Sequence, residues 1–205
     1  MIRSARLFFV LFVFLLPAGC VGLDPGPARV TVLLPTNISR ATQADRMPAQ
    51  VVVAYPAADG ATGTDRIMAL VNGYELRALD SAKWVNPVPV IVQRQFVDAL
   101  EASRRFTSVN WDADDVNDQY RLATDIRRFF LRYDTPGGPP AADISMVFSL
   151  IRTDTGTILA RRYVRVEKAS QGNSLDAFVA AFSLAMDDTL EQTVQWVVET
   201  LEKER

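Results

Sequence analysis

Apolar side chains fill every second position from Ile144 to Leu150, the pattern of a strand with one buried face. Residues 158–166 are a second strand-like run. The Asp-Thr-Gly sequence at 154–156 lies between the two runs and is typical of a turn. The pattern therefore predicts an antiparallel hairpin in the second half of the chain.

A second hairpin is predicted in the first half of the chain. Residues 65–71 and 74–79 both have strand character, and they flank Asn72 and Gly73. Asn-Gly is the strongest short signal for a two-residue hairpin turn, because both positions require a positive φ.

Three further segments are predicted as strands. Residues 29–34 and 50–54 are short and rich in β-branched side chains. Residues 120–133 form a longer run in which Phe129, Phe130 and Leu131 break the alternation of the residues before them. This break predicts either a β-bulge or burial on both faces of the strand.

Two amphipathic helices complete the pattern. The first follows Pro87 and Pro89, residues that suit the first turn of a helix, and carries an apolar stripe through Phe96 and Leu100. The second begins after Ser174, a good N-cap residue, and its apolar stripe extends to Leu201. These elements predict an α+β fold, with two main helices packed on one face of an antiparallel sheet.

The N-terminus has the organisation of a bacterial export signal. Arg3 and Arg6 precede an unbroken apolar run at residues 7–16. This run is shorter than the roughly 20 residues of a membrane-spanning helix and has the size of a signal-peptide core. Small residues then lead directly to Cys20, as in a lipobox, the sequence at which a lipoprotein precursor is lipidated and cleaved.

We therefore expect residues 1–19 to be a lipoprotein signal peptide and Cys20 to carry the lipid. Residues 20–27, rich in Pro and Gly, are expected to form a tether, and residues 28–205 a single periplasmic domain. The alternative is an ordinary secretory signal that has a cysteine nearby. A lone cysteine favours lipidation, because it would otherwise be a free thiol in an oxidising compartment.

The residues directly after Cys20 indicate whether the lipoprotein belongs to the inner or the outer membrane. In many Gram-negative bacteria an Asp directly after the lipidated cysteine retains a lipoprotein in the inner membrane. Val21 and Gly22 stand here instead. We therefore expect the protein on the periplasmic face of the outer membrane.

Composition excludes most catalytic and nucleic-acid-binding classes. Without Arg3 and Arg6 the mature chain has 20 basic and 24 acidic residues, a balance that gives no reason to expect nucleic-acid binding. The chain has no histidine and its one cysteine is assigned to lipid, which removes the usual general base and most zinc sites. No phosphate-binding loop occurs. We expect no enzyme activity, no cofactor and no metal.

Two residue groups leave an alternative open. Four carboxylates lie close together at Asp112, Asp114, Asp115 and Asp118, but the Gly and Glu positions of a calcium loop are not matched, so a solvated loop is the simpler interpretation. Trp84, before the first helix, is a tentative partner-binding residue because Trp is enriched at interface hot spots. The alternative for Trp84 is a core aromatic.

The ordered set of features resembles the ABC-type transport auxiliary lipoproteins, which accompany lipid transporters whose periplasmic component has a mammalian-cell-entry (MCE) domain. The resemblance extends over about residues 28–200 and rests on short motifs in a fixed order, beginning with the lipobox. These motifs are Asp65-Arg66-Ile67, Tyr74, Lys83-Trp84, Pro87, Phe106 with Val109, Tyr120-Arg121-Leu122 with Ile126 and Phe129, Gly156 with Ile158-Leu159 and Arg162, and finally Phe178, Ala181 and Trp196-Val197.

The resemblance implies a non-catalytic lipoprotein that assists lipid traffic between the inner and outer membranes. Its expected partner is the MCE-domain periplasmic protein of an ABC lipid transporter, and a homo-oligomeric ring is a further expectation. The alternative is a structural or assembly lipoprotein of another cell-envelope complex.

Overall fold

The computed structural model describes residues 29–31, 46–111, 119–135 and 137–204. Its centre is an antiparallel meander of three long strands, β7 (Tyr120–Arg132), β8 (Ala141–Arg152) and β9 (Thr157–Ala169). The predicted hairpin of the second half is therefore confirmed, and Gly156 in its turn has a φ of 65°. Of the two alternatives predicted for Phe129, Phe130 and Leu131, burial on both faces is confirmed, because all three side chains are buried. The β7–β8 register shifts just before them, between Ile126 and Arg128.

The other edge of β7 carries two separate branches of shorter strands. Near its start, β7 pairs in parallel with β2 (Gln50–Val53), which pairs in turn with β6 (Ser108–Trp111). The short β3 (Ala57–Ala58) pairs with the middle of β7.

Near its end, β7 pairs in parallel with β4 (Arg66–Val71), the first strand of the predicted Asn-Gly hairpin. The second strand of that hairpin, β5 (Glu75–Trp84), pairs with β1 (Arg29–Thr31). Asn72 and Gly73 have φ values of 55° and 78°, as expected for an Asn-Gly turn. The connection is one residue longer than the predicted two, because Val71 pairs with Glu75 and Tyr74 is the third residue of the loop.

The predicted α+β class is confirmed, with one addition to the predicted antiparallel sheet. The long pairings are antiparallel, but β1, β2, β3, β4 and β6 join the sheet through parallel pairings. Parallel neighbours need a connection that crosses over. Between β2 and β6 this connection contains β3, the β4–β5 hairpin and the first helix.

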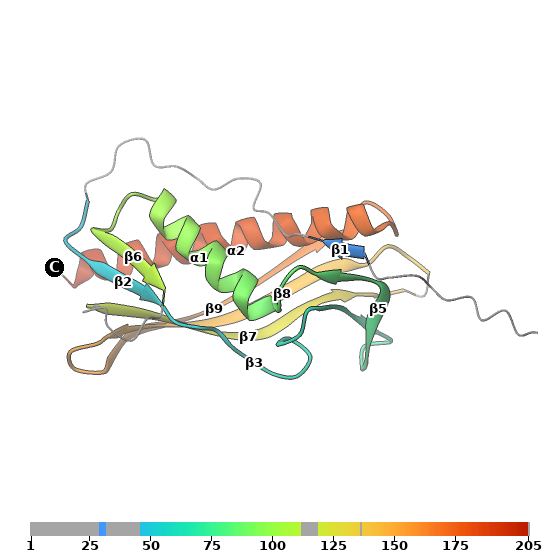
Figure 1. The fold of residues 1–205 in the computed structure, drawn as a ribbon, viewed down its shortest axis with the longest axis horizontal. Helices are drawn as coiled ribbons and strands as arrows, with labels where there is room; N and C mark the ends of the chain where they lie inside the picture. The colour runs from blue at the N-terminus through green and yellow to red at the C-terminus, as the bar shows by residue number, and fades with distance from the viewer. Residues whose placement is uncertain (1–28, 32–45, 112–118, 136, 205) are drawn as a thin grey trace, which may run out of the picture.

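Both helices lie on one face of the sheet, as predicted (Figure 1). α1 (Val88–Ala102) begins after Pro87 and has a second proline in its first turn. α2 (Leu175–Lys203) begins at Ser174, whose hydroxyl accepts a hydrogen bond from the Ala177 N–H at 3.2 Å. Their apolar stripes and the inward residues of β7 and β8 form one buried cluster that reaches from Met47 to Leu201.

Candidate functional site

Trp84 lies in the centre of this core. Its side chain is 1 % exposed and lies edge-on to the rings of Phe129 and Phe182, with centroids 5.9 and 5.2 Å away. It sits at the end of β5, where Ala82 and Trp84 point inward and Lys83 points outward. The tentative partner-binding role is corrected on this ground, because a side chain enclosed by the core offers no surface to a partner.

Other candidate residues lie outside the described part of the chain. These are Cys20, the expected lipidation site, and the carboxylates between residues 112 and 118. Among the residues that the structure describes, no three His, Cys, Asp or Glu side chains come together in a group that could hold a metal ion. Over the same ranges, no helix is long and apolar enough to cross a membrane.

The face of the sheet opposite the helices carries a buried carboxylate that the sequence did not indicate. Asp143 on β8 is 0 % exposed and accepts two hydrogen bonds from Arg165 on β9, at 3.0 Å from Nε and 2.8 Å from Nη2. A third comes from Nη1 of Arg128 on β7, also at 3.0 Å. Hydrogen bonding to Asp143 raises the pKa of Arg165, so this guanidinium stays cationic. The cluster therefore ties the three long strands together across the open face.

We expect Asp143→Asn to lower the free energy of unfolding by about 1–3 kcal/mol, because an amide cannot satisfy two guanidinium groups. This loss is smaller than for a fully buried ion pair, because the side chains of Arg128 and Arg165 are partly exposed and water can hydrate them when the carboxylate is lost. Asp125→Asn is the matched control. Asp125 pairs with Arg127 at the surface, so its loss should be about 0.5 kcal/mol or less. Equal shifts of the two variants in urea unfolding would contradict a structural role for the Asp143 cluster.

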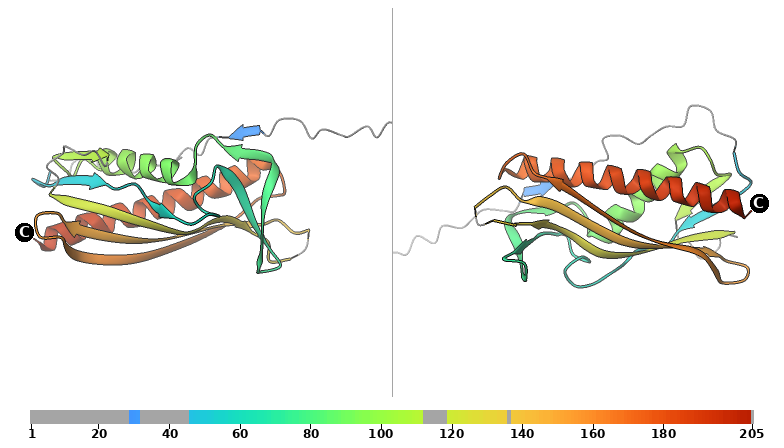
Figure 2. Two further views of the ribbon diagram at one scale, coloured as in Figure 1. Left: turned by 60° about the horizontal axis from the view of Figure 1, so that its bottom comes forward. Right: turned by 180° about the vertical axis from the view of Figure 1, so that it is seen from behind.

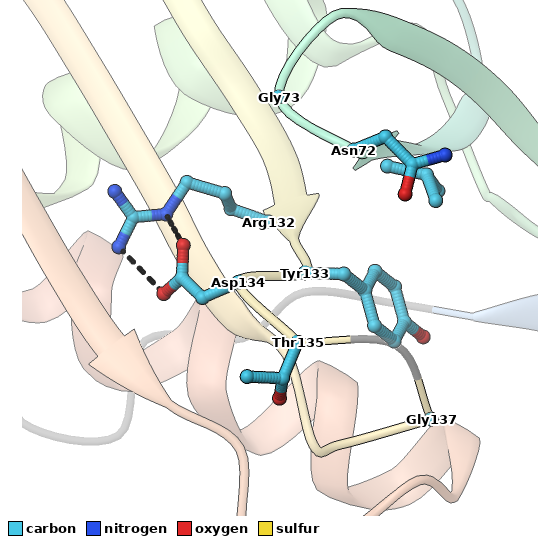
Figure 3. A pocket seen from close by; sticks show the side chains of 8 residues that line it. Asn72, Gly73, Arg132, Tyr133, Asp134, Thr135 and Gly137 are labelled. Atoms are coloured by element: carbon cyan, nitrogen blue, oxygen red, sulfur yellow. Dashed lines mark hydrogen bonds and ion pairs between the residues drawn. The ribbon is translucent and has the colours of Figure 1, made fainter.

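A half-open hollow of about 660 Å³ lies between the tip of the β4–β5 hairpin and the chain that follows β7. Figure 3 shows Arg132 and Tyr133 at the end of β7, pointing to opposite sides. Arg132 is held by Asp134 at 3.2 Å and by Glu167 at 2.7 Å. Tyr133 packs against the core, and burial raises the pKa of its hydroxyl above the ordinary value of 10.0. The hydroxyl is therefore neutral at physiological pH and acts as a hydrogen-bonding group.

The lining of this hollow combines apolar and polar surface. Val71 and the ring of Tyr133 supply apolar surface, while Asn72 and Thr135 supply polar groups. Its cation, Arg132, already has two acidic partners.

The hairpin beside the hollow carries a strongly exposed aromatic residue. Tyr74 follows the Asn-Gly turn and is 82 % exposed. Leu76, two residues further along β5, is also exposed. Tyr74 is the third residue of the loop that joins β4 and β5, at the tip of the hairpin, where neighbouring strands do not cover it.

β9 offers an interaction surface of a different kind. In the part of the chain that the structure describes, β8 is its only neighbouring strand, so its outer edge is unpaired. Arg161, Arg162 and Tyr163 follow one another on this strand, and the Tyr163 ring is largely exposed. Arg165 and Lys168 are engaged with acidic residues, whereas Arg161 and Arg162 make no ion pair with another described residue. The edge is therefore basic and carries the residue types that are enriched at binding hot spots.

The sequence profile of the ABC-type transport auxiliary lipoprotein component matches residues 33–194. The chain belongs to this family. The resemblance inferred from the ordered motifs is therefore confirmed. As a member of a lipoprotein family, the protein is assigned to the cell envelope. A comparison with curated proteins finds no relative.

Solved structures share the fold of this auxiliary lipoprotein. A protein from Xanthomonas campestris is 24 % identical, with a TM-score of 0.79 over 86 % of this chain and 98 % of its own. An uncharacterized protein is 15 % identical, with a TM-score of 0.66 over 83 % and 98 %. A hypothetical protein from Chlamydia trachomatis is 7 % identical, with a TM-score of 0.54 over 74 % and 96 %. At these identities the likeness is one of fold alone.

Proposed function

We propose that the protein is a periplasmic lipoprotein, anchored in the outer membrane through Cys20, that serves as a non-catalytic auxiliary component of an ABC/MCE-type lipid transport system. Family membership over residues 33–194 is the observation that carries the proposal. The leader with its apolar run at residues 7–16 and the position of Cys20 support the anchor. The proposed partner is the periplasmic part of the MCE-domain protein.

We assign the docking role to the outer edge of β9. An unpaired strand edge can bind an extended segment through backbone hydrogen bonds, and neighbouring side chains then select the partner. Arg161, Arg162 and Tyr163 suit an acidic segment that also buries an aromatic ring. The same edge can join copies of this chain, and a ring follows where such head-to-tail interfaces close.

The test is co-purification of the full-length lipoprotein with the periplasmic part of an MCE-domain protein encoded nearby, without added metal or nucleotide. We expect a complex at about 50 µM or below. The double variant Arg161→Glu with Arg162→Glu should weaken the complex about tenfold or more, because it places like charges at the contact.

The matched control changes the net charge equally at another place. Arg46 and Arg104 are exposed and lie outside β9, so the double variant Arg46→Glu with Arg104→Glu should leave affinity nearly unchanged. If both double variants weaken the complex equally, docking through β9 is wrong. If the unaltered protein forms no complex at all, the partnership itself is wrong, and another envelope complex becomes the better candidate.

A further inference from the structure

The β4–β5 hairpin projects beyond the sheet at the end of the molecule where β1 lies (Figure 2). The pairing of β4 with β7 extends from Met68 to Leu70, so only the turn and the pair of residues beside it, Val71 and Glu75, extend past β7. The turn at Asn72 and Gly73 is the tip, and Tyr74 beside it is 82 % exposed, more than any other large apolar or aromatic side chain among the described residues. The tip therefore presents a largely accessible aromatic ring to the surroundings of the domain.

The charges of this hairpin are balanced within it. Arg77 pairs with Glu75 at 2.7 Å, Lys83 with Asp65 at 3.3 Å and Arg66 with Asp80 at 3.5 Å. The hairpin therefore presents no excess of either charge, and its tip offers an aromatic ring with a polar end. Tyr and Trp side chains of this character are enriched at membrane–water interfaces, where the ring lies among the headgroups.

The length of the tether keeps the start of the domain close to the membrane. β1 begins at Arg29, nine residues after Cys20, and nine residues span at most about 30 Å when fully extended. A lipid on Cys20 would thus keep Arg29 within about 30 Å of the bilayer. β1 pairs with the far end of β5, where Arg29 lies opposite Ala82. Because Ala82 is eight residues along the chain from Tyr74, the tip lies at most about 30 Å from this pairing.

We propose that the tip of the β4–β5 hairpin, led by Tyr74, rests in the headgroup region of the membrane that holds the lipid anchor. This inference rests on the proposed function, because it requires the lipid on Cys20. The contact orients the domain on the membrane, so that the β8–β9 turn lies at the far end. Since the hairpin charges are internally paired, the contact depends on the aromatic ring and not on anionic lipid.

The experiment uses the full-length lipoprotein in vesicles of phosphatidylcholine and phosphatidylethanolamine. Cys20 is the only cysteine of the chain, so once it is lipidated an introduced cysteine is the one reactive thiol. Leu76→Cys places an environment-sensitive fluorophore next to the tip and keeps Tyr74 in place. Ile158→Cys is the control, because Ile158 is similarly exposed but lies beside the β8–β9 turn.

Nitroxide groups attached to the lipids should quench the label at position 76 about twofold or more relative to the label at position 158. Adding Tyr74→Ser to the Leu76→Cys protein should abolish this difference. Replacing part of the phosphatidylcholine with phosphatidylglycerol should leave it unchanged, as expected for a contact made without unpaired cations.

Three results would overturn the inference, and each identifies a different cause of the failure. Equal, weak quenching at both positions, with the protein still floating with the vesicles, rejects the contact and leaves the anchor intact. Protection of position 76 from a water-soluble reductant without lipid quenching means that another copy of the chain covers the hairpin. A protein that carries two labels per chain and does not float has no lipid on Cys20, and then the anchor and the contact both fail.

Discussion

Replacing Trp84 with alanine is expected to remove about 3–5 kcal/mol from the free energy of unfolding. Trp84 is enclosed by the core and packs edge-on against Phe129 and Phe182, which stack on each other at 5.1 Å. Deleting the indole leaves a cavity between β5, β7 and α2. Because domains of this size are stable by only about 5–15 kcal/mol, the loss should shift the urea midpoint strongly and leave part of the protein unfolded at 37 °C.

Two further tryptophan variants show whether this loss comes from the core. Trp111 is 39 % exposed and lies under the guanidinium of Arg94, 5.3 Å from its ring centroid. Trp111→Ala should therefore lower stability by only about 1 kcal/mol. Trp84→Phe keeps most of the packing and removes the buried indole N–H, which finds no hydrogen-bond partner among the described residues. It should therefore lower stability less than Trp84→Ala. If Trp84→Ala melts like the unaltered protein and loses partner binding instead, Trp84 is an interface residue after all.

The elements that could be predicted are those with a complete local signal. The Asn72–Gly73 sequence fixes the place of the β4–β5 turn, and the Ser174 cap fixes the start of α2, because each depends on residues close together in the chain. The strand β6 was not predicted. Its four residues, Ser108–Trp111, alternate polar and apolar side chains over too short a run to indicate a strand, and the strand forms because β2 is available as a parallel neighbour.

The difference between local and long-range signals also explains why the sequence left the role of Trp84 open and did not indicate the buried Asp143. Trp84 belongs to a strand that continues past Asp80 and Ser81, two polar residues that conceal its continuation. Only with the strand extended does parity place Trp84 on the inner face beside Ala82. The burial of Asp143 depends on Arg128 and Arg165, which are 15 and 22 residues away in the chain. Such long-range pairs follow from strand register, which no short motif specifies.

Cys20→Ala is expected to move the protein from the membrane fraction to the soluble periplasmic fraction. A mature lipoprotein is held by two or three acyl chains, each contributing about 0.8 kcal/mol per buried CH₂, so the lipidated form should not leave the bilayer. A contact through Tyr74 alone is far weaker than that anchor and should not retain the domain. The variant should be exported behind an ordinary cleavable leader, because an uncleaved run at residues 7–16 would itself hold the chain at the inner membrane.

Fractionation after a carbonate wash measures the effect, and mass spectrometry of the unaltered protein should show the acyl chains on Cys20. Val21→Ala, made with the native leader, is the matched control, since it leaves the cysteine in place and should remain with the membranes. Density-gradient separation of the two membranes then places the unaltered protein. Banding with the inner membrane would contradict the sorting inferred from Val21 and Gly22, and a Cys20→Ala protein that resists the wash would show that lipid is not what holds this domain.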